Sequence, residues 1–561
     1  MKKDENLNKK YEPILRKTKE WPVVLLSKHR KEFIQEVAEE SYERIKLLRP
    51  NSTSVIEELE TTLYRERLRV KRNPWKVDPK DEAEFWSKIK SRLVNLSGNN
   101  LVNNDNEDKI LKDIIERYAN EIAGNFNPSH YRLAREIVKF GFARLLNASR
   151  VKKFGAFFRN HYTLQDKIQI MGEVEQLREL AKTGTVILVP THFSNLDSIL
   201  IGWIIHILGL PPFIYGAGLN LFNIKIIAYF MNSLGAYKVD RRKKNLPYIE
   251  TLKTYSRLAI QRGAHSLFFP GGTRSRSGKL EKELKLGLLG SAMEAQRSLY
   301  ENGSTGTEGK IFVVPVTLNY NFVLEAPVLI NDYLKRKGQE RYYVENDRFS
   351  TSYRILKFLV KFFTRGSDIS VSIGRGMDIL GNYVTKEGVS LDAHNREIDT
   401  RDYFVSNGEI TLNKQRESEY TRMLSKAIVN EFHRISRVFA SHLVAFVAFR
   451  MLRKRYDKLD LYNFLRIPEE ELIIDMEEFK PVFSMLRDKL FELEKQDKIK
   501  TAPALSESVE DAIKKGVRNV GMYHDQRPLL ISKKGYLYTQ NINTLYYYHN
   551  RLDGYDLEKY F

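Results

Sequence analysis

The chain of 561 residues contains no cysteine. This absence excludes disulfides, cysteine-ligated metal sites and a thiol nucleophile, and it is compatible with a reducing compartment. Long apolar runs are also missing. The best candidate, Ile199 to Leu210, carries His206 and stops at Pro211, whereas a membrane-spanning helix needs about 18 or more apolar residues. We therefore expect a buried or interfacial helix there and no spanning segment. The charged residues 1–20 lack the apolar core of a signal peptide, so none is expected.

Acidic residues are in deficit, because 92 Lys and Arg stand against 71 Asp and Glu and give a formal net charge of +21. Such an excess indicates an anionic partner, which can be nucleic acid, an anionic membrane surface or a phosphorylated substrate. A second candidate for a membrane contact is the helix expected over 438–451, which has a basic end. An amphipathic helix of this kind either packs in a core or lies on a membrane surface.

The periodicity of apolar residues divides the chain into regions. Helical periodicity dominates before residue 152, whereas short continuous apolar runs alternate with helical stretches afterwards. This alternation is typical of α/β layers, and the length of the chain indicates about three to four domains. We predict a charged tail (1–20), a helical N-terminal region (21–152), an α/β domain (155–385), a linker (391–413) and a mainly helical C-terminal region (414–561). The predicted strands are 185–190, 212–215, 264–269, 311–317 and 369–373.

A histidine and an aspartate follow the first of these buried strands. His192 comes directly after the run that ends at Pro190, and Asp197 stands five residues later. Across one helical turn the carboxylate can return to the imidazole, fix its tautomer and stabilise its protonated form. The same spacing also occurs at His161 and His394. Neither of those copies follows a buried strand, so we predict that only His192 and Asp197 form a catalytic pair.

A glycine-rich turn with two arginines follows the predicted strand 264–269. Gly271 and Gly272 allow close backbone approach, and Arg274 and Arg276 add forked donors that suit a phosphate group. We predict a substrate-binding loop formed by Gly272, Thr273, Arg274, Ser275, Arg276 and Lys285. The alternative is a basic surface loop. Arg241, after a short predicted strand, either reaches the same pocket, belongs to a solvated basic run or contacts lipid headgroups.

Four sequence blocks, in this order, resemble the H-x4-D glycerolipid acyltransferase superfamily: 191–197, 235–241, 269–279 and 313–316. The closer likeness is to the large membrane-associated glycerol-3-phosphate acyltransferases and their dihydroxyacetone-phosphate relatives. Residues 218–221, 285–289, 314–325 and the aromatic tail 545–550 support this narrower resemblance. It implies an α/β fold with a central mixed sheet flanked by helices, and with helical N- and C-terminal regions.

By this resemblance the chain would be an O-acyltransferase of phospholipid biosynthesis. It would move a fatty acyl group from acyl-CoA or acyl carrier protein to the sn-1 hydroxyl of glycerol 3-phosphate and yield lysophosphatidate. His192 would be the general base and Asp197 its orienting partner, while Arg274, Arg276 and Lys285, with Arg241, would hold the phosphate. The resemblance implies no bound cofactor or metal, no nucleic-acid partner and a peripheral position on the cytoplasmic face of a membrane.

The chain departs from the family pattern at two places. Gly271 stands where the third block usually has glutamate, and Asn321 and Phe322 stand where the fourth block usually has an Asp-Arg pair. These departures leave two alternatives open. The acceptor could be a lysophospholipid such as 1-acylglycerol 3-phosphate, or the chain could be an inactive, basic protein that binds membranes or nucleic acid.

Overall fold

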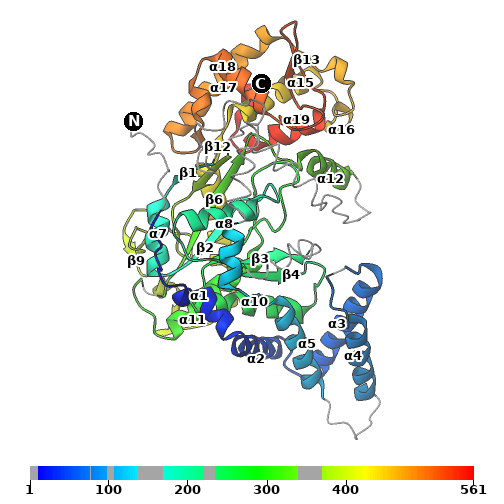
Figure 1. Cartoon of the computed structure of the whole chain (residues 1–561), viewed down its shortest axis with the longest axis vertical. Helices are drawn as coiled ribbons and strands as arrows, with labels where there is room; N and C mark the ends of the chain where they lie inside the picture. Colours follow the sequence, from blue (N-terminus) through cyan, green and yellow to red (C-terminus); the bar gives the residue numbers. More distant parts are fainter. Residues whose placement is uncertain are drawn as a thin grey trace.

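The computed structural model describes residues 11–75, 77–97, 106–136, 168–219, 231, 234–307, 309–338 and 369–561. Three parts follow one another along its long axis (Figure 1). Helices from the N-terminal region lie at one end, the α/β part lies in the middle, and the helical C-terminal region lies at the other end. This order agrees with the α/β architecture and helical flanking regions that the sequence predicts.

The N-terminal helices share a core with one helix and two edge-side strands of the α/β part, which contribute Ile214 and Tyr237. The N-terminal helices are α1 (Pro22–Lys28), α2 (Arg30–Leu48), α3 (Ser52–Arg72), α4 (Glu82–Ser97) and α5 (Glu107–Ile122). Asparagine side chains cap two of them, Asn51 at α3 and Asn106 at α5, and satisfy backbone N–H groups that have no partner in the first turn. Both α2 and α5 pack on α10 (Leu246–Gln261), which couples this region to the sheet.

A seven-stranded mixed sheet forms the centre of the molecule, with strand order β1-β7-β6-β2-β5-β3-β4. Its strands are β1 (Ile168–Gly172), β2 (Thr185–Pro190), β3 (Ile214–Gly218), β4 (Ala236–Val239), β5 (Ser266–Leu267), β6 (Ile311–Tyr320) and β7 (Ile369–Ile373). Strands β6, β2, β5, β3 and β4 run parallel to one another, whereas β7 runs antiparallel to β6 and parallel to β1. The predicted central mixed sheet is therefore confirmed.

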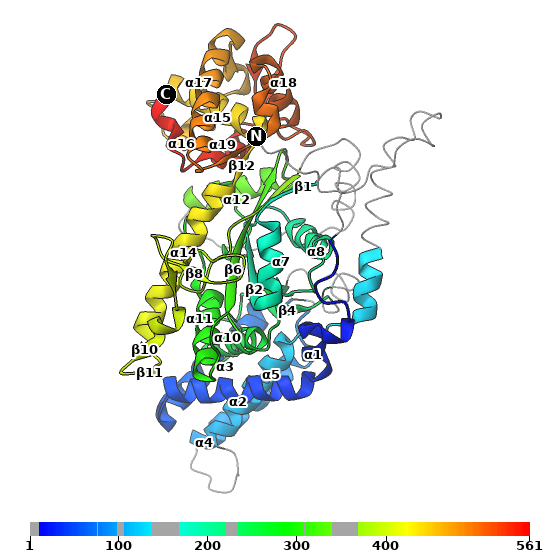
Figure 2. The same cartoon turned by 90° about the vertical axis from the view of Figure 1, so that its left-hand side faces the viewer.

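Both faces of β2 are buried, as its continuous apolar run predicts. Val186 and Leu188 pack into the core that contains α7 (Val174–Thr183) and α8 (Asp197–Ile207). Ile187 and Val189 face the opposite core, which contains residues of α10, α11 (Leu286–Glu301) and α14 (Lys414–Ile435). Figure 2 shows α7 and α8 on one side of the sheet and α11 and α14 on the other.

The apolar segment Ile199 to Leu210 is mostly buried. It falls largely on α8, whose Leu200, Ile201 and Ile204 belong to the main core, whereas Ile199 is exposed. Within the described ranges, no helix is both long enough and apolar enough to cross a membrane.

Residues 391–413, interpreted from the sequence as a linker, are folded. Phe404 is fully buried against Tyr300 and packs with α11 and α14. The sequence interpretation missed this anchor because one aromatic residue in a polar stretch produces no apolar period. The elements are β8 (Ser390–Leu391), β9 (Glu397–Ile398), the 3-10 helix Thr400–Phe404, β10 (Val405–Ser406) and β11 (Glu409–Ile410).

The C-terminal region is built around α15 (Ala440–Arg455). Its residues from Ala440 to Phe449 are buried, and it contacts α17, α18 and α19. The helix expected over 438–451 therefore packs in a core. The other elements here are β12 (Arg437–Val438), α16 (Leu461–Phe464), β13 (Ile473–Ile474), α17 (Met476–Lys495), β14 (Lys500–Thr501), α18 (Val509–Asn519), β15 (Leu530–Ile531), β16 (Leu537–Tyr538), α19 (Ile542–His549) and the 3-10 helix Asn550–Leu552. Helix α12 (Ala326–Gly338) packs against α19.

Candidate active site

His192 and Asp197 lie together at the carboxyl edge of the sheet. β2 ends at Pro190, and Asp197 is the first residue of α8. The Nδ1 atom of His192 lies 2.8 Å from Oδ2 of Asp197. Because an ionised carboxylate can only accept, Nδ1 carries the hydrogen and Nε2 is left as the proton acceptor. The imidazole remains partly accessible, with 15% of its side chain exposed.

The carboxylate of Asp197 is held by hydrogen bonds from the turn that carries His192 and from β6. The side chain is completely buried, and Oδ2 also accepts the backbone N–H of Phe193 at 2.7 Å and of Ser194 at 2.9 Å. The hydroxyl of Tyr320, at the end of β6, donates to Oδ1. The N-terminus of α8 adds a favourable dipole for a negative charge. These contacts fix the orientation of the carboxylate, which is what an orienting partner of a base requires.

The turn that carries His192 is bonded to the glycine-arginine segment. The backbone N–H of Ser275 donates to the His192 carbonyl at 2.7 Å, and the His192 backbone N–H donates to Oε1 of Glu281 at 3.4 Å. The imidazole also stacks on the ring of Phe269, with centroids 4.1 Å apart. The predicted base and the predicted phosphate loop thus form one unit.

The predicted phosphate loop begins after β5 with a tight turn. Gly272 has a φ of +75°, a value that favours glycine, and its N–H donates to the Phe269 carbonyl at 2.9 Å. The Lys285 N–H closes the loop onto the Pro270 carbonyl at 2.7 Å, and the aliphatic stem of Lys285 lies over Gly272. Thr273 and Lys285 are exposed. The backbone therefore brings the cation of Lys285 back to the start of the loop.

The side chains of the loop have different partners. Ser275 donates its hydroxyl to the Lys279 carbonyl at 2.7 Å, which shapes the loop. Arg274 lies 3.3 Å from a carboxylate oxygen of Glu325, and Arg276 lies 3.1 Å from one of Asp332 on α12. Arg274 therefore faces the His192 turn through Glu325, while Arg276 is directed toward α12.

Glu325 was quoted in the sequence only as the end of the fourth block, but it joins three blocks. Its carboxylate accepts the Ser194 hydroxyl at 3.1 Å and the Asn195 backbone N–H at 2.9 Å, and it pairs with Arg274. One buried glutamate after β6 thus connects the turn after β2 with the loop after β5. The resemblance of residues 314–325 to the fourth block was the available signal.

Arg241 lies at the same sheet edge but farther out. It follows β4, which is separated from β5 by β3, and neighbouring strands are spaced so that two steps span roughly 10 Å. The Arg241 side chain is exposed. Its neighbour Arg242 pairs with Asp240 and Asp78 and lies 4.0 Å over the Trp75 ring, so Arg242 connects this block to the N-terminal region.

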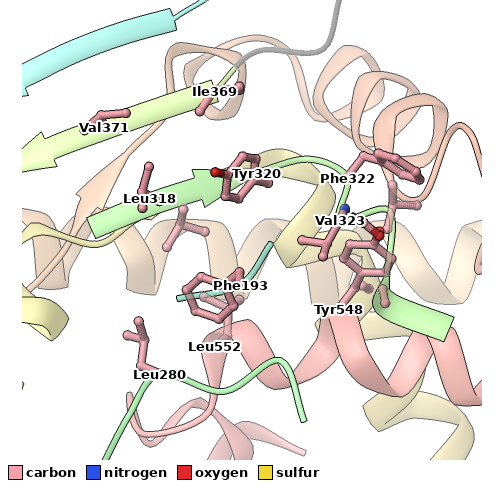
Figure 3. Packing of buried hydrophobic residues seen from close by; sticks show 14 of the residues in the cluster. Phe193, Leu280, Leu318, Tyr320, Phe322, Val323, Ile369, Val371, Tyr548 and Leu552 are labelled. Atoms are coloured by element: carbon pink, nitrogen blue, oxygen red, sulfur yellow. Dashed lines mark hydrogen bonds between the residues drawn. The ribbon is translucent and has the colours of Figure 1, made fainter. Parts of the chain in front are cut away.

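The aromatic C-terminal segment forms one wall of the site. A Cβ on Gly278 would lie 2.2 Å from the Tyr547 carbonyl oxygen, so only glycine allows this approach. Asn550 donates to the Ser277 carbonyl at 2.8 Å, and Lys279 pairs with Asp553 at 2.9 Å. Figure 3 shows Phe193 between Leu318 and Tyr320 of β6 and the C-terminal Leu552. The tail therefore helps to hold the phosphate loop.

A buried cation from the same tail lies over Phe193, the residue that follows the predicted base. The guanidinium of Arg551 stands 3.8 Å over the Phe193 ring, and its Nη2 donates to Oδ1 of Asn319 at 2.8 Å. Burial lowers the pKa of Arg551, while the nearby acidic groups, among them Glu281 and Asp197, act in the opposite direction. Arg551 was not singled out in the sequence, because nothing near position 551 indicates that the chain returns to β2.

The two residues that replace the Asp-Arg pair of the fourth block point toward the C-terminal region. Asn321 accepts the Ser441 hydroxyl at 2.6 Å, and Phe322 packs edge-on against Tyr523 with centroids 5.0 Å apart. Both side chains are buried. The amide of Asn321 and the ring of Phe322 thus connect the end of β6 to the C-terminal region.

The other H-x4-D copies do not form a comparable pair in the described residues. Asp399 caps a 3-10 helix by accepting the Arg401 N–H at 2.9 Å, and His394 is exposed on the β8–β9 turn. The copy at His161 lies outside the described residues, as do Asn220 and Leu221.

The sheet and the base-carboxylate pair together define the class of this domain, and the comparison with known families agrees. Residues 172–319 match the family described as "Acyltransferase". This segment contains His192, Asp197 and the predicted phosphate loop, and it is similar to the acyltransferase domains of the glycerolipid acyltransferase superfamily.

The particular resemblance is to glycerol-3-phosphate acyltransferases. The chain is 29% identical over 258 residues to the enzyme of that name from Aeromonas hydrophila subsp. hydrophila, covering 46% of this chain and 29% of the relative. It is 30% identical over 218 residues to that of Pseudoalteromonas translucida, covering 38% and 23%. The match thus spans less than a third of the length of either relative.

A comparison with solved structures finds the 1-acyl-sn-glycerophosphate (LPA) acyltransferase of Thermotoga maritima. The two chains share 13% sequence identity with a TM-score of 0.25, over 54% of this chain and 82% of that one. A likeness of this size carries no argument about the site.

Proposed function

We propose that this protein transfers a fatty acyl group from an acyl thioester, acyl-CoA or acyl carrier protein, to the sn-1 hydroxyl of glycerol 3-phosphate. The product would be lysophosphatidate, an early intermediate of phospholipid biosynthesis. One observation carries the proposal: the peptide groups of His192 are bonded to the same loop that carries Arg274. A base and a cationic loop held as one unit suit an acceptor whose hydroxyl and phosphate lie a few atoms apart.

In the proposed reaction His192 acts as the general base. Its Nε2 takes the proton of the acceptor hydroxyl while that oxygen attacks the thioester carbonyl carbon. The tetrahedral intermediate then collapses, the carbon–sulfur bond breaks, and the imidazolium returns the proton to the departing thiolate. Asp197 stabilises the imidazolium between these two transfers. Backbone N–H groups at the edge of the sheet supply the kind of donor that stabilises a developing oxyanion.

The acceptor phosphate is assigned to the loop after β5. Arg274 and Lys285 offer the cations, and the exposed Thr273 adds a hydroxyl donor at the same loop. Arg276 and the outlying Arg241 complete the cationic edge. Glu325 already holds Arg274 in place, so its guanidinium is oriented before the substrate arrives.

The acceptor can be tested directly, because the departures at Asn321 and Phe322 leave a lysophospholipid as the second candidate. We expect acylation of glycerol 3-phosphate to exceed that of 1-acylglycerol 3-phosphate at least about tenfold in kcat/KM, since the former needs only the phosphate loop and the base. Each acceptor is to be assayed with acyl-CoA and with acyl carrier protein. Activity on the lysophospholipid alone would assign the second function.

The net charge of +21 supports a peripheral position at the cytoplasmic face of an anionic membrane. We expect the protein to sediment with vesicles that contain anionic lipids and to be released by salt, because the attraction is screened within about 10 Å at 0.1 M ionic strength. Neutral vesicles are the control. Salt-sensitive binding to DNA or RNA, together with no acyl transfer, would instead support an inactive nucleic-acid-binding protein.

A further inference from the structure

Gly271 lacks a side chain where the resembling family has glutamate, and the structure shows what occupies that space. A Cβ built on Gly271 would lie 2.9 Å from both Cγ and Oε1 of Glu281. The carboxyl group of Glu281 therefore already stands beside the Gly271 backbone. It reaches this place from ten positions later in the chain, on the segment that returns from the phosphate loop to α11.

The return path of the chain fixes this arrangement. Leu280 and Leu284 are buried on either side of the returning segment, whereas Lys282 and Glu283 are exposed. Figure 3 shows Leu280 below Phe193, in the core next to the His192 turn. With both leucines anchored, Glu281 is directed inward although it belongs to a charged, polar stretch.

The two oxygens of the Glu281 carboxyl group differ in their contacts with the described residues. Oε1 accepts the backbone N–H of His192 at 3.4 Å. Oε2 is enclosed and has no hydrogen-bond partner among the residues that the structure describes. A buried carboxyl oxygen without a partner is unfavourable, so the position of Glu281 calls for an explanation beyond packing.

We propose that Glu281 is a positioning residue for acyl transfer, a displaced carboxyl group that takes the place of the side chain missing at Gly271 and holds the peptide N–H of His192. This inference rests on the proposed function. The His192 carbonyl is already held by the Ser275 N–H at 2.7 Å. With Glu281 on the other side, both peptide groups of the base are bonded to the segment that carries the phosphate loop.

The pKa of the Glu281 carboxyl group depends on its burial and on the groups around it. Burial raises this pKa to about 7, and Asp197 acts in the same direction, whereas the backbone N–H groups of Glu281 and His192, and Arg551, favour the ionised form. Because the folded pKa lies above the usual value, the folded protein binds this proton more tightly than the unfolded chain does. Stability therefore falls as pH rises from about 4.5 through about 7, and a glutamine at 281 removes that fall.

Three variants test the proposal through kcat and KM for glycerol 3-phosphate. Glu281→Ala is expected to lower kcat about tenfold with little change in KM, because it releases the base and not the phosphate loop. Glu281→Gln keeps an acceptor for the His192 N–H and should retain most of the activity. The double variant Gly271→Glu/Glu281→Ala should recover most of the loss, since Gly271 has an ordinary φ and the vacated space admits the new side chain. The exposed Glu283→Gln is the matched control.

The outcomes separate this inference from the proposed function. A wild-type protein that acylates glycerol 3-phosphate, with a folded Glu281→Ala variant of unchanged kcat, would overturn the positioning role alone. A folded Gly271→Glu/Glu281→Ala variant whose kcat does not exceed that of Glu281→Ala would also overturn the positioning role. If the wild type transfers no acyl group, the proposed function fails, and the pH dependence of the melting temperatures still tests whether the Glu281 carboxyl group is enclosed. The difference between Glu281→Gln and wild type should grow from pH 5 to pH 8, and a constant difference would contradict the enclosed carboxyl group.

Discussion

Replacement of His192 by alanine is expected to lower kcat for acyl transfer by about a thousandfold, within the 10² to 10⁴ that a general base contributes. The reason is that no other group takes over the proton at the position that Nε2 occupies. Asp197→Asn should come close to this loss. An amide can donate to Nδ1 and thereby favour the wrong tautomer, and it no longer stabilises the imidazolium. Steady-state rates at saturating thioester measure both effects.

His394→Ala is the matched control for this prediction. It has the same spacing to an aspartate as His192 does, but it is exposed on the β8–β9 turn. We expect unchanged activity from it. The circular dichroism spectrum and melting temperature of each variant show whether the fold is kept. A folded His192→Ala protein with wild-type kcat would refute the assignment of the base.

Replacement of Arg274 by alanine is expected to raise KM for glycerol 3-phosphate about 10- to 100-fold, with a smaller effect on KM for the thioester. Hydrogen bonds to a charged group contribute about 1.5–3 kcal/mol, which corresponds to this range. The KM of Arg274→Lys for glycerol 3-phosphate should fall between those of wild type and Arg274→Ala, because lysine keeps the charge and loses the forked geometry. The measurement is the dependence of rate on acceptor concentration at fixed thioester.

The fold should tolerate the loss of Arg274. Its partner Glu325 remains bonded to the Ser194 hydroxyl and the Asn195 N–H, so its carboxylate is not left without partners. Arg422→Ala, an exposed arginine on α14, is the control for a general effect of charge. An Arg274→Ala protein with unchanged acceptor KM would show that the phosphate binds elsewhere.

The sequence predicted the central sheet because β2 and β6 are continuous apolar runs, which indicate strands buried on both faces. The same context selected His192 from three histidines with identical spacing to an aspartate. The folded hairpins at 391–413 were missed, since Phe404 is the one fully buried hydrophobic residue in this stretch and a single residue produces no period. The local pattern of apolar residues therefore predicted the main strands and helices well, but it predicted the segments between them poorly.

The parts of the site that escaped prediction come from contacts between distant positions. Glu281 and Arg551 are ordinary charged residues in the sequence, and only the path of the chain brings Glu281 to the His192 N–H and Arg551 over the Phe193 ring. Gly271 is an example of a position where the sequence and the structure lead to different conclusions. Its sequence position indicates a missing carboxylate, whereas the structure places a carboxyl group from Glu281 in the same space.

Transfer of an acyl group to radiolabelled glycerol 3-phosphate tests the central claim most directly. Wild type, His192→Ala and His394→Ala would be compared, each supplied with acyl-CoA and with acyl carrier protein. We predict labelled lysophosphatidate from wild type and His394→Ala with at least one donor, and almost none from His192→Ala. Folded wild-type protein that forms no labelled lysophosphatidate with either donor would contradict the account.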